Sequence, residues 1–154
     1  MGVVLLIEDD EALGRQVVDQ LEAAGFSAVW WRRGRIIDAA DYREIVLVIL
    51  DLMLPGVGGL DILRQLRQDS DVPVLVLSAR QDSNDKVLAL KLGADDYVTK
   101  PLWPEELIER VRARLRRFVM ERSAQVKRGG LVIDGAKREV TVPMPFNGGP
   151  PFTS

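Results

Sequence analysis

The sequence predicts a doubly wound α/β fold, in which helices cover both faces of a five-stranded parallel sheet. Five short apolar segments, rich in Val, Ile and Leu, alternate with segments whose apolar residues recur at helical spacing. Such alternation indicates right-handed βαβ crossovers. The central segment, Ile45–Leu50, is continuously apolar, as expected for a strand that is buried on both faces. We expect the strand order 2-1-3-4-5, which is the flavodoxin-like arrangement.

The chain before the central segment supplies two strands and two helices. Residues 3–7 are continuously apolar and are predicted to form the first strand. Residues 12–24 have apolar side chains at helical spacing, and Gly25 is expected to end that helix. Residues 27–31 are more mixed in polarity, which indicates a strand near the sheet edge. Residues 34–40 are expected to form a short helix.

The chain after the central segment continues the same alternation. Gly93 follows a helical pattern and is expected to end it. Pro104 is followed by two glutamates, a composition that favours the beginning of a helix. The predicted elements are a helix over 60–66, a strand over 74–77, a helix over 83–92, a strand over 96–99 and a last helix from Pro104 to near Arg117.

Three parts are predicted along the chain. Residues 1–118 form one α/β domain, residues 119–128 form a linker, and residues 129–154 hold a short β-hairpin. The strands of the hairpin are expected at 131–134 and 138–142. Since a hairpin by itself is marginally stable in water, this one needs a further partner.

The composition excludes several classes of chemistry. The chain has neither cysteine nor histidine, which rules out disulfides, Ser-His-Asp and Cys-His catalysis, and most zinc sites. No apolar run approaches the roughly 18 residues of a membrane-spanning helix, and no secretory leader precedes the first strand. We therefore expect a cytoplasmic protein without a membrane partner. The net charge of -2 gives no sign of nucleic-acid binding.

Polar side chains gather where the predicted strands end. Because the carboxyl ends of parallel strands meet at one edge of the sheet, acids from the first and third strands should lie together. Carboxylates this close repel each other, and a divalent cation such as Mg²⁺ relieves the repulsion. A lysine and a serine add a positive charge and a hydroxyl donor for phosphoryl oxygens. The pattern predicts a metal-assisted phosphoryl-transfer site with Asp51 as nucleophile, built from Glu8, Asp9, Asp51, Ser78 and Lys100.

Four motifs follow one another along the chain. They are Glu8-Asp9-Asp10, Asp51-Leu52-Met53-Leu54-Pro55, Ser78-Ala79-Arg80 and Gly93-Ala94-Asp95-Asp96-Tyr97-Val98-Thr99-Lys100-Pro101. In this order they resemble the receiver domain of two-component response regulators of the OmpR/PhoB-like subfamily, and the resemblance covers residues 2–118. It implies a signalling protein that accepts a phosphoryl group from a phosphohistidine of a sensor histidine kinase onto Asp51. Autodephosphorylation would be slow at most, so no enzyme with turnover is expected.

The resemblance also implies how the acidic residues share one Mg²⁺ ion. Asp9 and Asp51 would bind the ion directly, together with the main-chain carbonyl of Met53. Glu8 would act through a metal-bound water. Lys100 would pair with the phosphoryl oxygens once Asp51 is modified.

A switch and a dimer are implied by the same resemblance. Ser78 would move toward the phosphoryl group, Tyr97 would follow it inward, and the Lys100-Pro101 peptide bond would be cis. We expect phosphorylation to favour a two-fold dimer through the fourth predicted helix, the fifth strand and the fifth helix. A self-complementary patch needs charges of both signs. The implied face holds Lys86, Lys91, Asp95, Asp96, Glu106, Arg110 and Arg114.

Residues 129–154 resemble the opening β-hairpin of the winged-helix DNA-binding domain of this subfamily. The helices of that domain, including the one that enters the major groove, would follow Ser154. The chain therefore resembles a response regulator truncated early in its DNA-binding domain. DNA binding and transcriptional regulation are expected only of a full-length parent protein.

Three other functions remain open at this point. Phosphatases of the haloacid dehalogenase type also use a strand-end Asp as nucleophile, but they carry a second Asp where this chain has Met53. An apolar strand ending in Asp also resembles the Walker B motif of a nucleotide-binding switch, although no Gly-x-x-x-x-Gly-Lys-Ser/Thr accompanies it. The third is a receiver-like interaction module that is never phosphorylated. The joint presence of Asp9, Asp51, Ser78 and Lys100 favours the phosphoacceptor.

Overall fold

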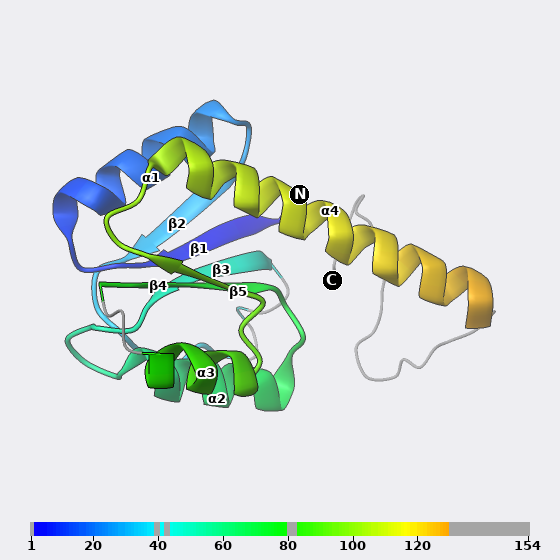
Figure 1. Ribbon diagram of the computed structural model, residues 1–154. Helices are drawn as coiled ribbons and strands as arrows, with labels where there is room; N and C mark the ends of the chain where they lie inside the picture. The colour runs from blue at the N-terminus through cyan, green and yellow to red at the C-terminus, as the bar shows by residue number, and fades with distance from the viewer. Residues whose placement is uncertain (1, 39–40, 42–43, 80–82, 130–154) are drawn as a thin grey trace.

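The computed structural model describes residues 2–38, 41, 44–79 and 83–129 of the chain. Strands and helices alternate along these residues, as the sequence predicts (Figure 1). The strands are β1 (Val3–Ile7), β2 (Ser27–Trp31), β3 (Ile45–Asp51), β4 (Val74–Ser78) and β5 (Asp96–Thr99). The helices are α1 (Glu11–Ala23), α2 (Gly59–Asp69), α3 (Ser83–Lys91) and α4 (Pro104–Gly129).

The five strands form one parallel sheet in the order β2-β1-β3-β4-β5, which confirms the predicted order. Helices α1 and α4 cover one face of the sheet, and α2 and α3 cover the other (Figure 1). Because all strands run in the same direction, their carboxyl ends lie at one edge of the sheet. The residues at these ends build the site described below.

The strand β3 is continuously apolar because both of its faces are buried, so apolar and polar residues do not alternate along it. Leu47 and Ile49 belong to the core cluster that α1 and α4 close, whereas Val48 and Leu50 belong to the cluster that α2 and α3 close. All four side chains are fully buried. Burial of a side chain of this size stabilises the fold by about 1.5–3 kcal/mol, so β3 is held from both faces. Asp51 therefore extends from a strand that is anchored on two sides.

The helix predicted over residues 34–40 is wrong for the part of this segment that the structure describes, since residues 35–38 form no helix. The N–H of Gly34 instead donates to the carbonyl of Pro55 at 2.9 Å, and the Gly34 carbonyl accepts from the N–H of Val57 at 3.1 Å. A helix that began here would need this carbonyl for the N–H of the fourth residue after it. The hydrogen bonds of Gly34 with the loop after β3 therefore replace those that a helix at this segment would need.

The helix α4 is longer than the sequence predicts. It continues to Gly129 through the segment 119–128, the predicted linker, instead of ending near Arg117. No glycine or proline lies between Arg117 and Gly129, so nothing in the backbone stops the helix. The domain boundary placed there stays a prediction. The predicted hairpin strands, 131–134 and 138–142, lie outside the described residues.

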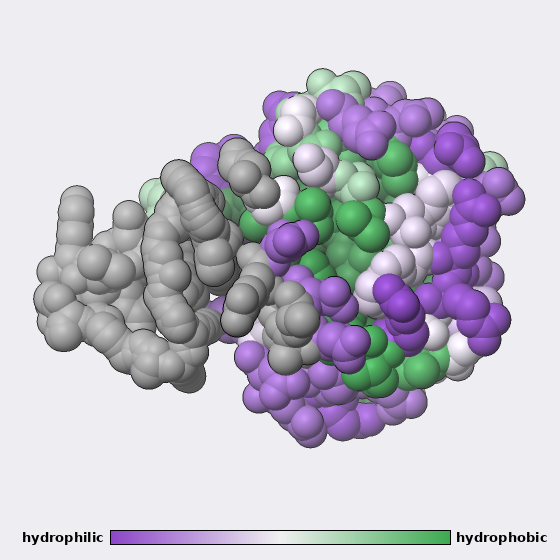
Figure 2. Space-filling model, turned by 180° about the vertical axis from the view of Figure 1, so that it is seen from behind, coloured by the Kyte–Doolittle hydropathy of each residue, from purple (hydrophilic) through white to green (hydrophobic). Residues whose placement is uncertain are grey.

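The surface is mostly hydrophilic and has smaller apolar areas (Figure 2). Figure 2 views the molecule from behind and shows hydrophobic residues gathered near the middle of that face, with hydrophilic residues around them. Elsewhere, Val87, Leu88 and Leu90 place exposed apolar side chains on α3. None of the helices in the described residues is both long enough and apolar enough to span a membrane.

Candidate functional site

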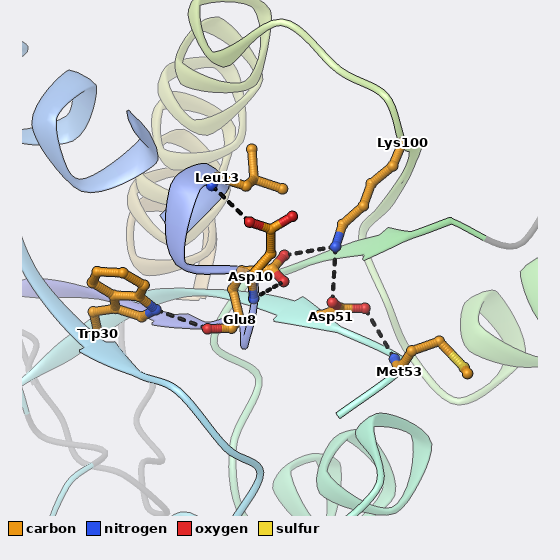
Figure 3. A network of polar contacts seen from close by, with 7 residues as sticks. All are labelled: Glu8, Asp10, Leu13, Trp30, Asp51, Met53 and Lys100. Atoms are coloured by element: carbon orange, nitrogen blue, oxygen red, sulfur yellow. Dashed lines mark hydrogen bonds and ion pairs between the residues drawn. The ribbon is translucent and has the colours of Figure 1, made fainter. Parts of the chain in front are cut away.

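The candidate site lies at the carboxyl edge of the sheet, where β1, β3 and β5 end (Figure 3). Glu8 follows β1, Asp51 is the last residue of β3, and Lys100 follows β5. The register of β1 on β3 pairs Ile7 with Leu50, which brings Glu8 and Asp51 to the same level of the sheet. Both acids are buried, with 0% and 2% of their surfaces exposed. The structure thus brings together three of the predicted site residues.

Lys100 joins the two buried carboxylates. Its Nζ atom lies 2.9 Å from Asp51 Oδ2 and 2.9 Å from Glu8 Oε1. Burial by itself disfavours the charged ammonium and lowers its pKa. Hydrogen bonds and charge attraction to Glu8 and Asp51 outweigh burial, so the pKa of Lys100 is raised above its ordinary value. Lys100 therefore stays a cation and divides its charge between two acids.

The main chain after Asp51 turns back onto the same carboxylate. Asp51 Oδ1 accepts a hydrogen bond from the backbone N–H of Met53 at 2.9 Å. The N–H of Leu52 donates to the carbonyl of Leu77 in β4 at 3.1 Å. Gly59, the first residue of α2, lies close to this turn. A Cβ atom at this position would lie only 2.6 Å from the carbonyl oxygen of Asp51, so the close approach requires glycine. These contacts fix the turn that carries Asp51 and Met53.

Glu8 is an acid whose ionised form is costly in this position. Its Oε2 atom accepts a hydrogen bond from the backbone N–H of Asp10 at 2.9 Å, and its Oε1 atom has the ion-pair contact with Lys100. Burial is the main cause that raises the pKa of Glu8 to about 7. The Asp10 N–H and the Lys100 ammonium oppose the rise, and the charge of Asp51 adds to it. A second cation beside Glu8 would favour its ionised form.

Asp9 completes an acidic cluster with Glu8 and Asp51. One carboxylate oxygen from each residue lies within 4.8 Å of the others, and Asp9 is exposed whereas the other two are buried. Three carboxylates against the single ammonium of Lys100 leave negative charge at this edge, which a divalent cation would neutralise. An all-oxygen set that is open to solvent on one side suits Mg²⁺, which keeps several waters. The residues present therefore fit a Mg²⁺ site.

The two predicted switch residues lie on the neighbouring strands. Ser78 ends β4 and is fully buried, and its carbonyl accepts a hydrogen bond from the N–H of Lys100 at 2.8 Å. The register of β3 on β4 places Ser78 one residue beyond the partner of Asp51. Tyr97 in β5 is half-buried and packs against the core cluster on the α2 side. The Lys100-Pro101 peptide bond is cis, as the resemblance implies.

The charged residues predicted for a dimer face are partly paired within the chain. Arg110 Nη1 lies 2.9 Å from Asp96 Oδ2, and Arg110 Nη2 lies 3.2 Å from Glu106 Oε2. Asp95 pairs with Arg67 of α2 at 3.0 Å. The other predicted members of the face lie on α3 and α4, namely Lys86, Lys91 and Arg114.

One residue that contacts the site carries no motif in the sequence. The indole Nε1 of Trp30 donates a hydrogen bond to the main-chain carbonyl of Glu8 at 2.8 Å (Figure 3). The predicted strand order places residues 27–31 beside the first strand, which indicates that the two are close. The direction of an indole N–H depends on a side-chain rotamer, and no pattern in the sequence reports it.

Comparison with known families agrees with this geometry. Residues 4–112 match the response regulator receiver domain. The chain belongs to the response regulator receiver family. The matched residues include the acidic cluster, Ser78 and Lys100, and the resemblance drawn from the four motifs is confirmed.

Curated relatives of this receiver chain include regulators of transcription. It is 43% identical over 139 residues to the DNA-binding response regulator MtrA of Mycolicibacterium smegmatis, covering 90% of this chain and 61% of MtrA. It is 40% identical over 157 residues to the uncharacterized transcriptional regulatory protein YkoG of Bacillus subtilis, covering 90% of this chain and 69% of YkoG. The chain therefore spans only part of the length of these relatives.

Solved structures of receiver domains share the fold. The BeF3-activated N-terminal receiver domain of Klebsiella pneumoniae RstA has a TM-score of 0.68 at 32% identity, covering 75% of this chain and 99% of that chain. DrrB of Thermotoga maritima, an OmpR/PhoB homolog, has a TM-score of 0.66 at 30% identity, covering 76% of this chain and 54% of that chain. The predicted fold class of the receiver part is confirmed.

Proposed function

We propose that this chain is the phosphoacceptor switch of a two-component system, and that Asp51 accepts a phosphoryl group from a phosphohistidine of a sensor histidine kinase. One observation carries the proposal. Asp51 is a buried carboxylate whose Oδ2 lies 2.9 Å from Lys100 Nζ, at the edge that also holds Glu8 and Asp9. Membership of the response regulator receiver family supports it.

Transfer to Asp51 would form one P–O bond and break the P–N bond of the donor. A carboxylate oxygen of Asp51 attacks phosphorus, and the imidazole of the donor leaves after taking up a proton. The N–H of Met53 holds Oδ1 and so orients the carboxylate for attack. The Lys100 ammonium, which contacts Oδ2 before transfer, would pair with the phosphoryl oxygens afterwards.

The acidic cluster would hold Mg²⁺ during this transfer. Asp9, Asp51 and the main-chain carbonyl of Met53 would be direct ligands, and Glu8 would act through a metal-bound water. When bound, Mg²⁺ supplies positive charge that neutralises the carboxylates and the phosphoryl oxygens. The exposure of Asp9 supports this assignment, because it leaves the cluster open to the donor and to water.

Phosphorylation would then move Ser78 and Tyr97 and favour a two-fold dimer. The hydrogen bond from the Lys100 N–H to the Ser78 carbonyl links the ends of β4 and β5, and α3 connects these strands along the chain. Val87 and Leu90 on α3 are 49% and 43% exposed, which supports an interface there. The charged part of the proposed face consists of Lys86, Lys91, Asp95, Asp96, Glu106, Arg110 and Arg114.

The site favours a switch over a phosphatase. A phosphatase of the haloacid dehalogenase type needs a second Asp two residues after the nucleophile, to act as acid and base. Met53 occupies this position. Without an acid–base group there, the phosphoryl group on Asp51 would be lost slowly, by attack of water.

For a longer protein that would contain this receiver, we propose transcriptional regulation through DNA binding. The relative MtrA is named as DNA-binding and YkoG as a transcriptional regulatory protein, and both are longer than the part matched here. The helix α4 extends past the sheet and reaches Gly129, so it would lead from the receiver toward a DNA-binding domain (Figure 1).

Intact-protein mass spectrometry after incubation with acetyl phosphate tests the proposed function. We expect one phosphoryl adduct that requires Mg²⁺, that is absent in Asp51→Asn and that persists in Asp61→Asn. Asp61 is an exposed acid of α2 and serves as the matched control. Failure of the folded wild type to form the adduct would favour a receiver-like interaction module that is never phosphorylated.

A further inference from the structure

We propose that Trp30 is a positioning residue for the Mg²⁺ site and that it acts through the Glu8–Asp9 peptide. The inference rests on the proposed function, because it concerns the cation that the acidic cluster would hold. The decisive contact is the hydrogen bond of 2.8 Å from the indole Nε1 of Trp30 to the carbonyl oxygen of Glu8 (Figure 3).

This carbonyl controls the placement of two acids at once. It belongs to the same planar peptide unit as the N–H and the Cα atom of Asp9. A held Glu8 carbonyl therefore fixes the orientation of this peptide plane and restrains the directions in which the Glu8 and Asp9 side chains leave the main chain. The N–H of Glu8 is held as well, since it donates to the carbonyl of Trp31 at 3.0 Å. The two tryptophans thus hold Glu8 by both of its main-chain polar groups.

The indole of Trp30 donates to the Glu8 carbonyl just beyond the end of the β1–β2 pairing. The strand β2 ends at Trp31, so it offers no further strand residue beside Glu8. Asp9 is exposed, so packing restrains its side chain less than it restrains the buried Glu8, and the main chain contributes more to its placement. A loss of the indole N–H would leave the Glu8–Asp9 peptide without this support, while the carboxylates and Lys100 stay unchanged.

The ring of Trp30 is itself held in place. Gly14 of α1 packs so closely against it that a Cβ atom at this position would overlap the ring. The guanidinium groups of Arg32 and Arg15 lie 4.3 Å and 5.5 Å from the ring centroid. Glu11 Oε2 pairs with Arg32 at 3.7 Å and with Arg15 at 4.0 Å. The indole N–H is therefore held in one direction, toward Glu8.

Titration of the chain with Mg²⁺, followed by two-dimensional NMR of the backbone amides, tests the inference. Trp30→Phe keeps an aromatic ring and removes the N–H. Trp31→Phe makes the same change one residue later, and Val17→Ala in α1 lowers stability away from the site. We expect Trp30→Phe to raise the Kd for Mg²⁺ by about three- to tenfold. Both control variants should stay within about twofold of the wild type.

A second measurement uses the wild type alone and does not depend on the folding of any variant. The indole N–H signal of Trp30 should shift on addition of Mg²⁺ by more than the indole signals of Trp31 and Trp103. An equal Kd for Trp30→Phe and Trp31→Phe, or an unmoved Trp30 signal, would overturn the positioning role and leave the proposed function standing. Absence of Mg²⁺ binding by the wild type would overturn both.

Discussion

At the scale of single residues, the site holds more negative charge than its own cation can neutralise. Lys100 Nζ lies 2.9 Å from each of two buried carboxylates, and the exposed carboxylate of Asp9 joins the same cluster. Phosphorylation would replace the single negative charge of the Asp51 carboxylate by the roughly 1.5 to 2 negative charges of a phosphoryl group, so the edge would become more negative still. Because burial already disfavours the charged form of Glu8, the stability of this edge should depend on pH and on Mg²⁺.

Glu8→Gln should stabilise the Mg²⁺-free protein at about pH 8, by about 1–3 kcal/mol. The pKa of Glu8 is about 7 in the folded chain, above its ordinary value of 4.5. Between these values the folded state binds more protons than the unfolded state, so stability falls as the pH rises through this window. Glutamine cannot ionise, so the free energy of unfolding of the variant does not fall in this way as the pH rises. Denaturant unfolding in the presence of a chelator, at several pH values, measures the effect.

The control for this comparison is Glu11→Gln, which removes an exposed acid and should change the free energy of unfolding by less than about 0.5 kcal/mol. The advantage of Glu8→Gln should fade toward about pH 4, where Glu8 is protonated in both states. If the variant and the wild type are equally stable at about pH 8, the cost assigned to ionised Glu8 is wrong.

Lys100→Met should destabilise the Mg²⁺-free protein and tighten its binding of Mg²⁺. The substitution keeps most of the side-chain volume but leaves Glu8 and Asp51 without their shared cation, which we expect to cost about 1–3 kcal/mol at this partly exposed position. The same loss removes a positive charge that repels Mg²⁺. Lys91→Met changes the net charge equally but at an exposed site of α3. An unchanged Mg²⁺ affinity in Lys100→Met, measured by NMR titration, would count against the assigned role of Lys100.

At the scale of elements, the loop after β3 depends on a link to the segment after β2. Gly34 exchanges two hydrogen bonds with this loop, through the carbonyl of Pro55 and the N–H of Val57. Gly56 between them has a φ of 87°, a left-handed conformation that glycine adopts without strain. Since the same loop carries Met53, the link helps to hold the turn that orients Asp51.

Gly34→Ala should destabilise the protein by about 1–3 kcal/mol, because its Cβ atom would overlap the carbonyl oxygen of Val57. Phosphorylation by acetyl phosphate should slow as well, since the shifted loop carries Met53. Gly58→Ala is the matched control in the same loop, where the nearest atom to an added Cβ is 3.8 Å away. Thermal unfolding of the two variants compares them directly, and equal melting temperatures would contradict the importance of the link.

Most elements of the described chain follow from local patterns, and the exceptions have physical reasons. Gly25 and Gly93 end helices with φ angles of 95° and 110°, as their positions after apolar periodicity predict. The helix predicted over 34–40 is wrong for residues 35–38, because the N–H and the carbonyl of Gly34 pair with a loop distant in sequence. The site acids and Lys100 converge because parallel topology brings strand ends together. The contact of Trp30 with Glu8 depends on rotamers and packing, which the sequence does not reveal.

At the scale of the whole molecule, the phosphoacceptor edge and the surface of α3 are different regions joined by β4 and β5. Ser78 and Lys100 connect these strands at the site, through the hydrogen bond of 2.8 Å. At the proposed dimer face, α3 carries exposed apolar residues, and Arg110 of α4 binds Asp96 of β5. A change at the site can therefore reach the proposed dimer face through two strands.

Val87→Lys should abolish dimerisation of the phosphorylated chain without affecting phosphorylation. Val87 is 49% exposed, so the change should cost less than about 0.5 kcal/mol of stability but would place a charge in the proposed interface. Ile36→Lys, at a position that is 44% exposed away from α3, is the matched control. Sedimentation velocity with acetyl phosphate and Mg²⁺ measures the oligomeric state. A dimer that survives Val87→Lys would place the interface elsewhere.

The most direct test of the account is the chemical location of the phosphoryl group. Borohydride reduces an aspartyl phosphate to homoserine, and peptide mapping by mass spectrometry then shows which residue was modified. After treatment with acetyl phosphate and Mg²⁺, we expect homoserine at position 51 alone and none when Mg²⁺ is withheld. Homoserine at position 9, or an unreduced Asp51 in a chain that carries the phosphoryl adduct, would contradict the assignment of Asp51 as phosphoacceptor.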